Sequence, residues 1–154
     1  MIERLKPKQS LDFLEFVSRA SDIHNDFYIT INKVRTFFQD LRLIKKVVET
    51  QEVYALWEKE LKGILIIYRE KGFRPYIKIL ASSVKMQSDL VKYLIWNFSN
   101  KDLYIKLKKQ NSLVKTLQRY GFIFAGDRGI EILLFRKGDK ELRKIGDKDD
   151  NNSN

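Results

Sequence analysis

The chain has 154 residues, the length of one ordinary domain. Hydrophobic residues make up 44% of the sequence and aromatic residues 12%, enough for a core, which excludes wholesale disorder. Cysteine is absent and His24 is the one histidine. This excludes a disulfide scaffold, a thiol nucleophile and a metal site built from cysteines or several histidines, so we expect no bound metal.

The net charge of +10 favours an acidic partner, such as a nucleic acid, an anionic membrane or a phosphorylated small molecule. The last 18 residues hold five basic and five acidic side chains, so the excess of positive charge belongs to residues 1–136. Residues 101–136 have eight Lys or Arg against three Asp or Glu. A scattered lysine surplus is also typical of a solvated surface.

Two observations indicate a soluble, cytoplasmic protein without a membrane segment. The densest apolar run, residues 63–68, is short and bounded by charge, and the first ten residues lack the apolar stretch of a secretory signal. The polar C-terminus has no apolar periodicity. We therefore expect a folded domain over residues 1–138 and a disordered tail over residues 139–154.

The N-terminal third predicts two helices. The first begins at Ser10, and its apolar face consists of Leu11, Leu14 and Val17, with Phe13 and Phe16 beside it. A polar loop around His24 follows. The second helix is predicted from apolar residues at i, i+3, i+4 and i+7, which are Val34, Phe37, Phe38 and Leu41.

Three short β-rich runs then predict an antiparallel meander over residues 53–57, 63–68 and 76–81. Ser88 and Asp89 start a helix, and residues 103–107 alternate apolar side chains with lysine, as a strand does. Asn111 and Ser112 cap a helix that Gly121 ends in the left-handed conformation. The last elements are strands 123–125 and 130–135, joined by the four-residue loop 126–129.

This order predicts a single domain of the α/β (α+β) class. It has one mixed, mostly antiparallel sheet with helices on both faces. The strand–helix–strand unit over residues 76–107 should form a right-handed crossover that places two strands parallel.

Residues 103–138 resemble the end of the GNAT superfamily of acyl-CoA-dependent N-acetyltransferases. They are similar to its fifth strand, fourth helix and terminal hairpin, with matching positions at Asn111, Arg119, Gly121 and Phe122. Residues 57–67 are similar to its second and third strands, with Gly63 at the glycine of the turn. The resemblance covers about residues 10–136 and implies transfer of an acyl group from acetyl-CoA, or another acyl-CoA, to a primary amine.

The resemblance also implies a cofactor site. In the family, backbone groups of the fourth strand bind the pantetheine arm, and the pyrophosphate lies on N–H groups that open the next helix. The implied cofactor-binding residues are Ile79, Leu80, Ala81, Lys85, Ser88, Asn111 and Arg119. One register places Ser88 on the first phosphate-loop glycine and Leu90 on the second, and another places Met86 and Ser88 there. Neither register supplies a glycine.

The implied catalytic residues are Tyr120 and His24. The family's tyrosine, which protonates the leaving thiolate, falls here on Leu117, and Tyr120 lies three residues further, turned by roughly 60° on a helix. His24 lies in the loop that borders the family's acceptor pocket and could deprotonate an amine, although its polar neighbours could also simply hydrogen-bond it. Glu58, Glu60 and Glu70 are further candidate bases.

Three functions remain open. The first is a working N-acyltransferase whose partner is an amine-bearing small molecule or protein. The second is a catalytically inactive GNAT-fold binding or structural protein, of cellular or viral origin, which would account for the missing glycines and tyrosine. The third is a basic nucleic-acid-binding domain, whose surface would consist of Lys106, Lys108, Lys109, Lys115 and Arg119 with Tyr104 and Tyr120. The hairpin 123–135 could also extend a sheet across a homodimer.

Overall fold

The computed structural model of the chain describes residues 1–20, 27–69 and 74–139. One antiparallel sheet has the strand order β1(Ile2–Arg4), β4(Glu52–Trp57), β5(Leu61–Tyr68) and β6(Tyr76–Ala81). A second has the order β7(Leu103–Lys108), β9(Glu131–Arg136) and β8(Ile123–Arg128). A separate hairpin consists of β2(Tyr28–Ile31) and β3(Val34–Phe37).

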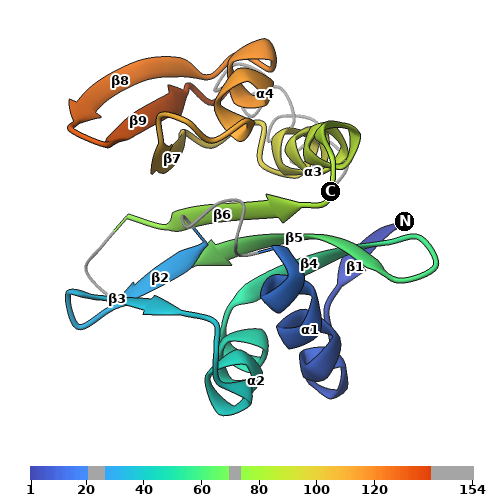
Figure 1. The fold of residues 1–154 in the computed structure, drawn as a ribbon. Helices are drawn as coiled ribbons and strands as arrows, with labels where there is room; N and C mark the ends of the chain where they lie inside the picture. The colour runs from blue at the N-terminus through green and yellow to red at the C-terminus, as the bar shows by residue number, and fades with distance from the viewer. Residues whose placement is uncertain (21–26, 70–73, 140–154) are drawn as a thin grey trace, which may run out of the picture.

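Helices cover both faces of the four-stranded sheet (Figure 1). α1(Ser10–Ala20), which follows the short 3-10 helix η1(Pro7–Gln9), and α2(Leu41–Thr50) pack on one face, where Phe13, Phe27 and Phe38 form an aromatic cluster. α3(Val84–Asn97) packs on the other face, α4(Leu113–Arg119) packs against α3, and both share a core with the three-stranded sheet. The α/β class with helices on both faces is therefore confirmed.

The sheet is divided, which differs from the predicted continuous sheet. β6 and β7 lie next to each other, but β6 has its ladder with β5 and β7 has its ladder with β9. The expected β-ladder between the two strands of the crossover is thus not formed among the described residues. Figure 1 shows the two sheets diverging at this point.

The predicted helix over Val34, Phe37, Phe38 and Leu41 is wrong. Asn32 and Lys33 have positive φ values of 49° and 67°, and this two-residue turn folds the segment into the β2–β3 hairpin. The next helix begins only after Asp40, whose Oδ1 accepts a hydrogen bond from the N–H of Arg42 at 2.8 Å. A short hairpin followed by a capped helix reproduced the apolar spacing of one helix.

Three smaller predictions also need correction. α1 turns Phe13, Phe16 and Val17 into the core, whereas Leu11 is exposed. α3 begins at Val84, one turn before the predicted start at Ser88 and Asp89, because Ser83 caps it. β8 continues through Arg128, so Gly129 and Ile130 alone join it to β9.

Gly63 has a packing role beside the middle of α3. A Cβ at this position would lie 2.8 Å from Cδ1 of Leu90, a fully buried side chain of α3. The missing side chain lets α3 approach β5 closely, at the position where the sequence resembles the GNAT turn. Gly121 ends α4 with a φ of 92°, as predicted.

The three-stranded sheet has β8 at its edge, where Ile123 and Phe124 are exposed. A homodimer through this hairpin stays a prediction, as does the predicted boundary between the domain and its tail, because residues 140–154 lie outside the described part. Among the residues described, no helix combines the length and apolar character needed to cross a membrane.

Candidate functional site

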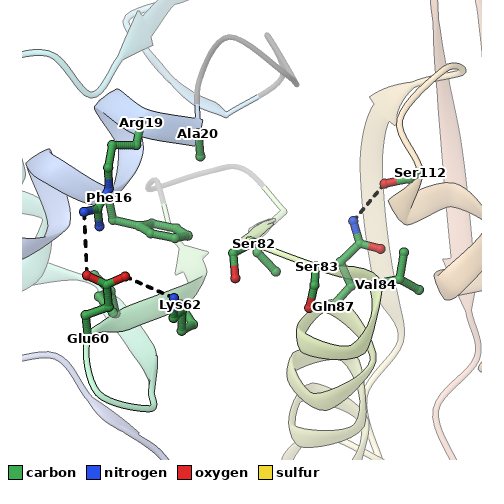
Figure 2. A pocket seen from close by; sticks show the side chains of 12 residues that line it. Phe16, Arg19, Ala20, Glu60, Lys62, Ser82, Ser83, Val84, Gln87 and Ser112 are labelled. Carbon is green, nitrogen blue, oxygen red and sulfur yellow. Dashed lines mark hydrogen bonds and ion pairs between the residues drawn. The ribbon is translucent and has the colours of Figure 1, made fainter.

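A cavity of about 420 Å³, here named the Ser83 cavity, lies where β6 ends and α3 begins. Figure 2 shows its lining side chains on two sides, with α1 and the β4–β5 turn facing the start of α3 and of α4. The residues that line it are Phe16, Arg19, Ala20, Glu60, Leu61, Lys62, Ala81, Ser82, Ser83, Val84, Gln87 and Ser112.

The N-terminus of α3 forms one wall of the Ser83 cavity. Ser83 is its N-cap, and its Oγ accepts a hydrogen bond from the N–H of Met86 at 3.2 Å, while its carbonyl accepts from the N–H of Gln87 at 3.0 Å. Val84 and Lys85 are the first two residues of the helix. Their N–H groups, the exposed serines and the positive end of a 14-residue helix make this wall suited to an anion.

The opposite wall carries both signs of charge. Oε1 of Glu60 accepts a hydrogen bond from Nζ of Lys62 at 3.0 Å, and Oε2 lies 3.7 Å from Nη1 of Arg19 (Figure 2). The Lys62 hydrogen bond, aided by the charges of Lys62 and Arg19, lowers the pKa of Glu60. Glu60 therefore stays ionised at neutral pH and offsets part of the positive charge of this wall.

A buried polar network joins α3 to α4 behind the cavity. Nε2 of Gln87 donates to Oγ of Ser112 at 2.9 Å, and Oγ1 of Thr116 donates to Oε1 of Gln87 at 3.1 Å. Gln87 and Thr116 are buried, so this satisfied network fixes the relative position of the two helices. This contact was not predicted, since no local pattern pairs residues 29 positions apart.

The predicted pantetheine-binding strand reaches the cavity at its end. Ala81 lines the Ser83 cavity, whereas the side chains of Ile79 and Leu80 are buried in the two cores on opposite faces of the sheet. Lys85 is exposed in the first turn of α3. Ser88 lies one turn further and is half-buried. Because it is the fifth residue of α3, its backbone N–H belongs to the helical ladder.

The two predicted cofactor residues of the next segment lie at opposite ends of α4. Oδ1 of Asn111, a buried side chain, accepts a hydrogen bond from the N–H of Leu113 at 2.9 Å and so caps the helix. Arg119 is exposed in the last turn, away from Ser112 and the cavity. The capping role of Asn111 is confirmed, and the cofactor role of both residues stays a prediction.

Of the two predicted catalytic residues, Tyr120 lies in the described part of the chain. Tyr120 lines a different groove with Tyr93 and Trp96 of α3, and Leu117 is fully buried in the core. His24 and Glu70 lie outside the described residues. Of the candidate glutamates, Glu60 alone lines the Ser83 cavity within the described part of the chain.

The basic residues predicted to bind nucleic acid do not form one surface. Lys106 alternates along β7 with Ile105 and Leu107, which pack in the core with α4, so Lys106 faces the other side of the sheet. Lys115 and Arg119 are exposed on α4. Lys109 is paired with Asp127 at 3.0 Å. Within the described ranges, no group of three or more His, Asp or Glu side chains is placed to hold a metal ion.

Known structures share this architecture. No family model and no curated protein matches the sequence. An N-acetyltransferase from Staphylococcus aureus Mu50 has a TM-score of 0.69 and 17% identity, over 89% of this chain and 96% of the other. A GNAT-family acetyltransferase from Streptococcus pneumoniae has a TM-score of 0.61 and 13% identity, over 88% and 98%.

The microcin C7 self-immunity acetyltransferase, solved in complex with acetyl-CoA and AMP, has a TM-score of 0.62 and 12% identity, over 88% of this chain and 91% of the other. Similarity at this level of identity concerns the arrangement of elements and not the chemistry. The chain therefore has the fold of the GNAT acetyltransferases, with a divergent sequence.

Proposed function

We propose that the chain is an acyl-CoA-dependent N-acyltransferase that binds its cofactor in the Ser83 cavity. The observation that carries this proposal is the position of the cavity, at the end of β6 where the two sheets separate and α3 begins. The fold supports it, since one protein that shares the fold was solved with acetyl-CoA.

The residues of the cavity fit a phosphate-bearing cofactor. The N–H groups of Val84 and Lys85, the hydroxyls of Ser82 and Ser83 and the ammonium of Lys62 would hold the pyrophosphate. Serine side chains in place of glycines keep a phosphate further from the backbone, so hydroxyls and cations carry more of the binding than they do in a glycine-rich loop. We therefore expect weaker cofactor binding than such a loop provides.

The bound cofactor supplies a thioester whose carbonyl carbon a primary amine attacks. The chain's own contribution is to position the two reactants. The ionisable side chains described along the cavity are Arg19, Glu60 and Lys62, and Glu60 is already paired with both cations. With Leu117 buried at the position of the family's tyrosine, we infer that water protonates the leaving thiolate and accepts the proton of the amine.

Calorimetric titration with acetyl-CoA tests the cofactor site. Wild-type protein should bind, Lys62→Ala should bind about tenfold more weakly because one charged contact is lost, and Ser82→Phe should fill the cavity and abolish binding. Lys45→Ala, an exposed lysine of α2, is the matched control and should bind as wild type does. Absence of binding by wild-type protein at millimolar acetyl-CoA would rule out the proposal.

An inactive binding protein is the second candidate function, favoured by the burial of Leu117 at the position of the family's tyrosine. The two candidates differ in turnover. Release of free coenzyme A thiol in the presence of amines supports the enzyme, whereas tight acetyl-CoA binding without thiol release across a broad amine panel supports the inactive protein.

A further inference from the structure

A second cavity, of about 440 Å³ and here named the Tyr28 cavity, opens on the first half of β6. Tyr76, Ile77 and Lys78 of this strand line it, whereas Ala81 at the other end of the strand lines the Ser83 cavity. The other walls come from the β2–β3 hairpin and from the three-stranded sheet. One strand thus connects the two cavities along the division between the sheets.

The Tyr28 cavity is strongly basic. Its lining includes five cationic side chains and no carboxylate among the described residues, the cations being Lys33, Arg74, Lys78, Lys106 and Arg128. No ion pair between described residues involves Lys33, Arg74, Lys106 or Arg128. Like charges around one cavity repel one another, and a bound anion relieves this repulsion.

The nearest carboxylate is already engaged. Glu131, a cross-strand neighbour of Arg128, is buried and accepts hydrogen bonds from Oη of Tyr28 at 2.9 Å and Nη2 of Arg35 at 2.6 Å. Neither Arg35 nor Glu131 lines the cavity. Their ion pair neutralises the charge of this carboxylate beside the cavity. The five positive charges of the lining therefore outnumber this single negative charge.

Two aromatic rings hold cations of this cavity in place. Nζ of Lys78, a buried side chain, lies 4.2 Å from the centroid of the Tyr28 ring, and Cζ of Arg74 lies 3.8 Å from that of the Tyr104 ring. Arg35 lies over Tyr28 as well, and Phe135 packs against Tyr104. Because these rings already contact cations and a neighbouring ring, the cavity suits a compact anion better than a stack of nucleic-acid bases.

The β2–β3 turn supplies a further indication that this cavity binds a ligand. Lys33 has a φ of 67°, a conformation that glycine adopts at lower cost. A glycine would make the turn more easily but would bring no ammonium to the cavity. The strained residue is thus one of the five cations.

We propose that the Tyr28 cavity binds the acceptor of the acyl transfer and that this acceptor is a small primary amine carrying a phosphate group. The inference rests on the proposed function. A phosphate monoester carries nearly two negative charges at neutral pH, so it matches a cluster of cations better than one carboxylate does. The acceptor enters as an ammonium and loses two protons, of which one ends on the sulfur and one goes to water. Its nitrogen forms the amide bond with the thioester carbonyl carbon, the carbon–sulfur bond breaks, and the sulfur leaves as the free thiol.

Matched amine pairs test this specificity. With acetyl-CoA as donor, kcat/KM should be at least about tenfold higher for phosphoethanolamine than for ethanolamine, and for glucosamine 6-phosphate than for glucosamine. The ratio within each pair should fall about tenfold in Lys106→Gln and in Arg128→Gln. It should stay unchanged in Lys115→Gln, a matched control on α4 whose side chain is exposed.

A binding readout separates this inference from the proposed function. Millimolar phosphoethanolamine should raise the Tm of wild-type protein and leave that of a Lys106→Gln, Arg128→Gln double variant unchanged. Failure of acetyl-CoA to bind would remove the proposed function and with it the role of acyl acceptor, whereas the thermal shift, which needs no cofactor, still tests whether the cavity binds the phosphorylated amine. Absence of the shift, or equal or better use of the unphosphorylated amines, would overturn the proposal that the acceptor carries a phosphate.

Discussion

The Ser83 cavity and the Tyr28 cavity lie at the two ends of one strand, β6, but their charges have different origins. The first combines a helix N-terminus with two cations that share Glu60. The second combines five cationic side chains from separate segments, with no carboxylate among its described lining residues. One site therefore depends on secondary structure, and the other depends on individual side chains.

This difference has a consequence for tolerance to sequence change. A helix N-terminus presents N–H groups whatever side chains surround it, so the Ser83 cavity keeps anion donors although the expected glycines are missing. A cluster of cationic side chains has no backbone groups that remain after substitution, because each substitution removes one charge. We expect substitutions in the Tyr28 cavity to change substrate choice, and substitutions around the Ser83 cavity to change cofactor affinity or stability.

Lys106→Glu should have the largest effect. Reversing this charge replaces an attraction to phosphate by a repulsion, so kcat/KM for phosphoethanolamine should fall about 100-fold, with little change in acetyl-CoA affinity. Steady-state kinetics and calorimetry measure the two quantities. Lys115→Glu makes the same charge change on the exposed side of α4, and an equal loss in that variant would show that overall charge, not the cavity, selects the substrate.

Gln87→Ala should destabilise the fold. It leaves the buried hydroxyl of Thr116 without its partner at 3.1 Å, which costs about 1–3 kcal/mol and lowers Tm by roughly 3–10 °C. Thermal denaturation measures the change, and Gln118→Ala on the exposed face of α4 serves as the control. If the two variants have the same Tm, the hydrogen-bond network behind the Ser83 cavity does not stabilise the packing of α3 against α4.

Lys33→Gly should separate stability from activity in the Tyr28 cavity. Relief of the positive φ, less the greater chain entropy of glycine, should stabilise the protein by about 0.5–1 kcal/mol. The same change should lower kcat/KM for phosphoethanolamine, because one cation is lost. Denaturant titration and kinetics test the two parts, and a variant that is more stable and fully active would remove Lys33 from the site.

Glu60→Gln should have the smallest effect, a gain of about threefold in acetyl-CoA affinity, because Arg19 and Lys62 lose their shared counter-charge.

The pKa of Glu60 is lowered from its ordinary value of 4.5, so its ion pairs stabilise the fold above that pH. This contribution is lost as the pH falls through the lower folded-state pKa. The difference in Tm between wild-type protein and Glu60→Gln should therefore shrink below pH 4.5. A Tm difference that stays constant with pH would contradict a stabilising role of these ion pairs.

Local patterns were sufficient for several elements. The three runs that predicted a meander are β4, β5 and β6, and Asn111 and Gly121 begin and end α4 as expected. These features depend on alternation and on caps within a few residues. The predicted helix around Phe37 failed because apolar spacing alone does not distinguish a helix from a hairpin followed by a helix, and the turn at Asn32 and Lys33 lacks the glycine that would have marked it.

The sequence by itself determined the excess of positive charge, the strands of the meander, the α4 cap and the resemblance to the GNAT fold. The tertiary structure decided where that charge gathers. Lys33, Lys78, Lys106 and Arg128 come from separate segments and line one cavity because strand register and the division between the sheets bring them there. Such pairings depend on contacts between distant parts of the chain, which no local pattern encodes.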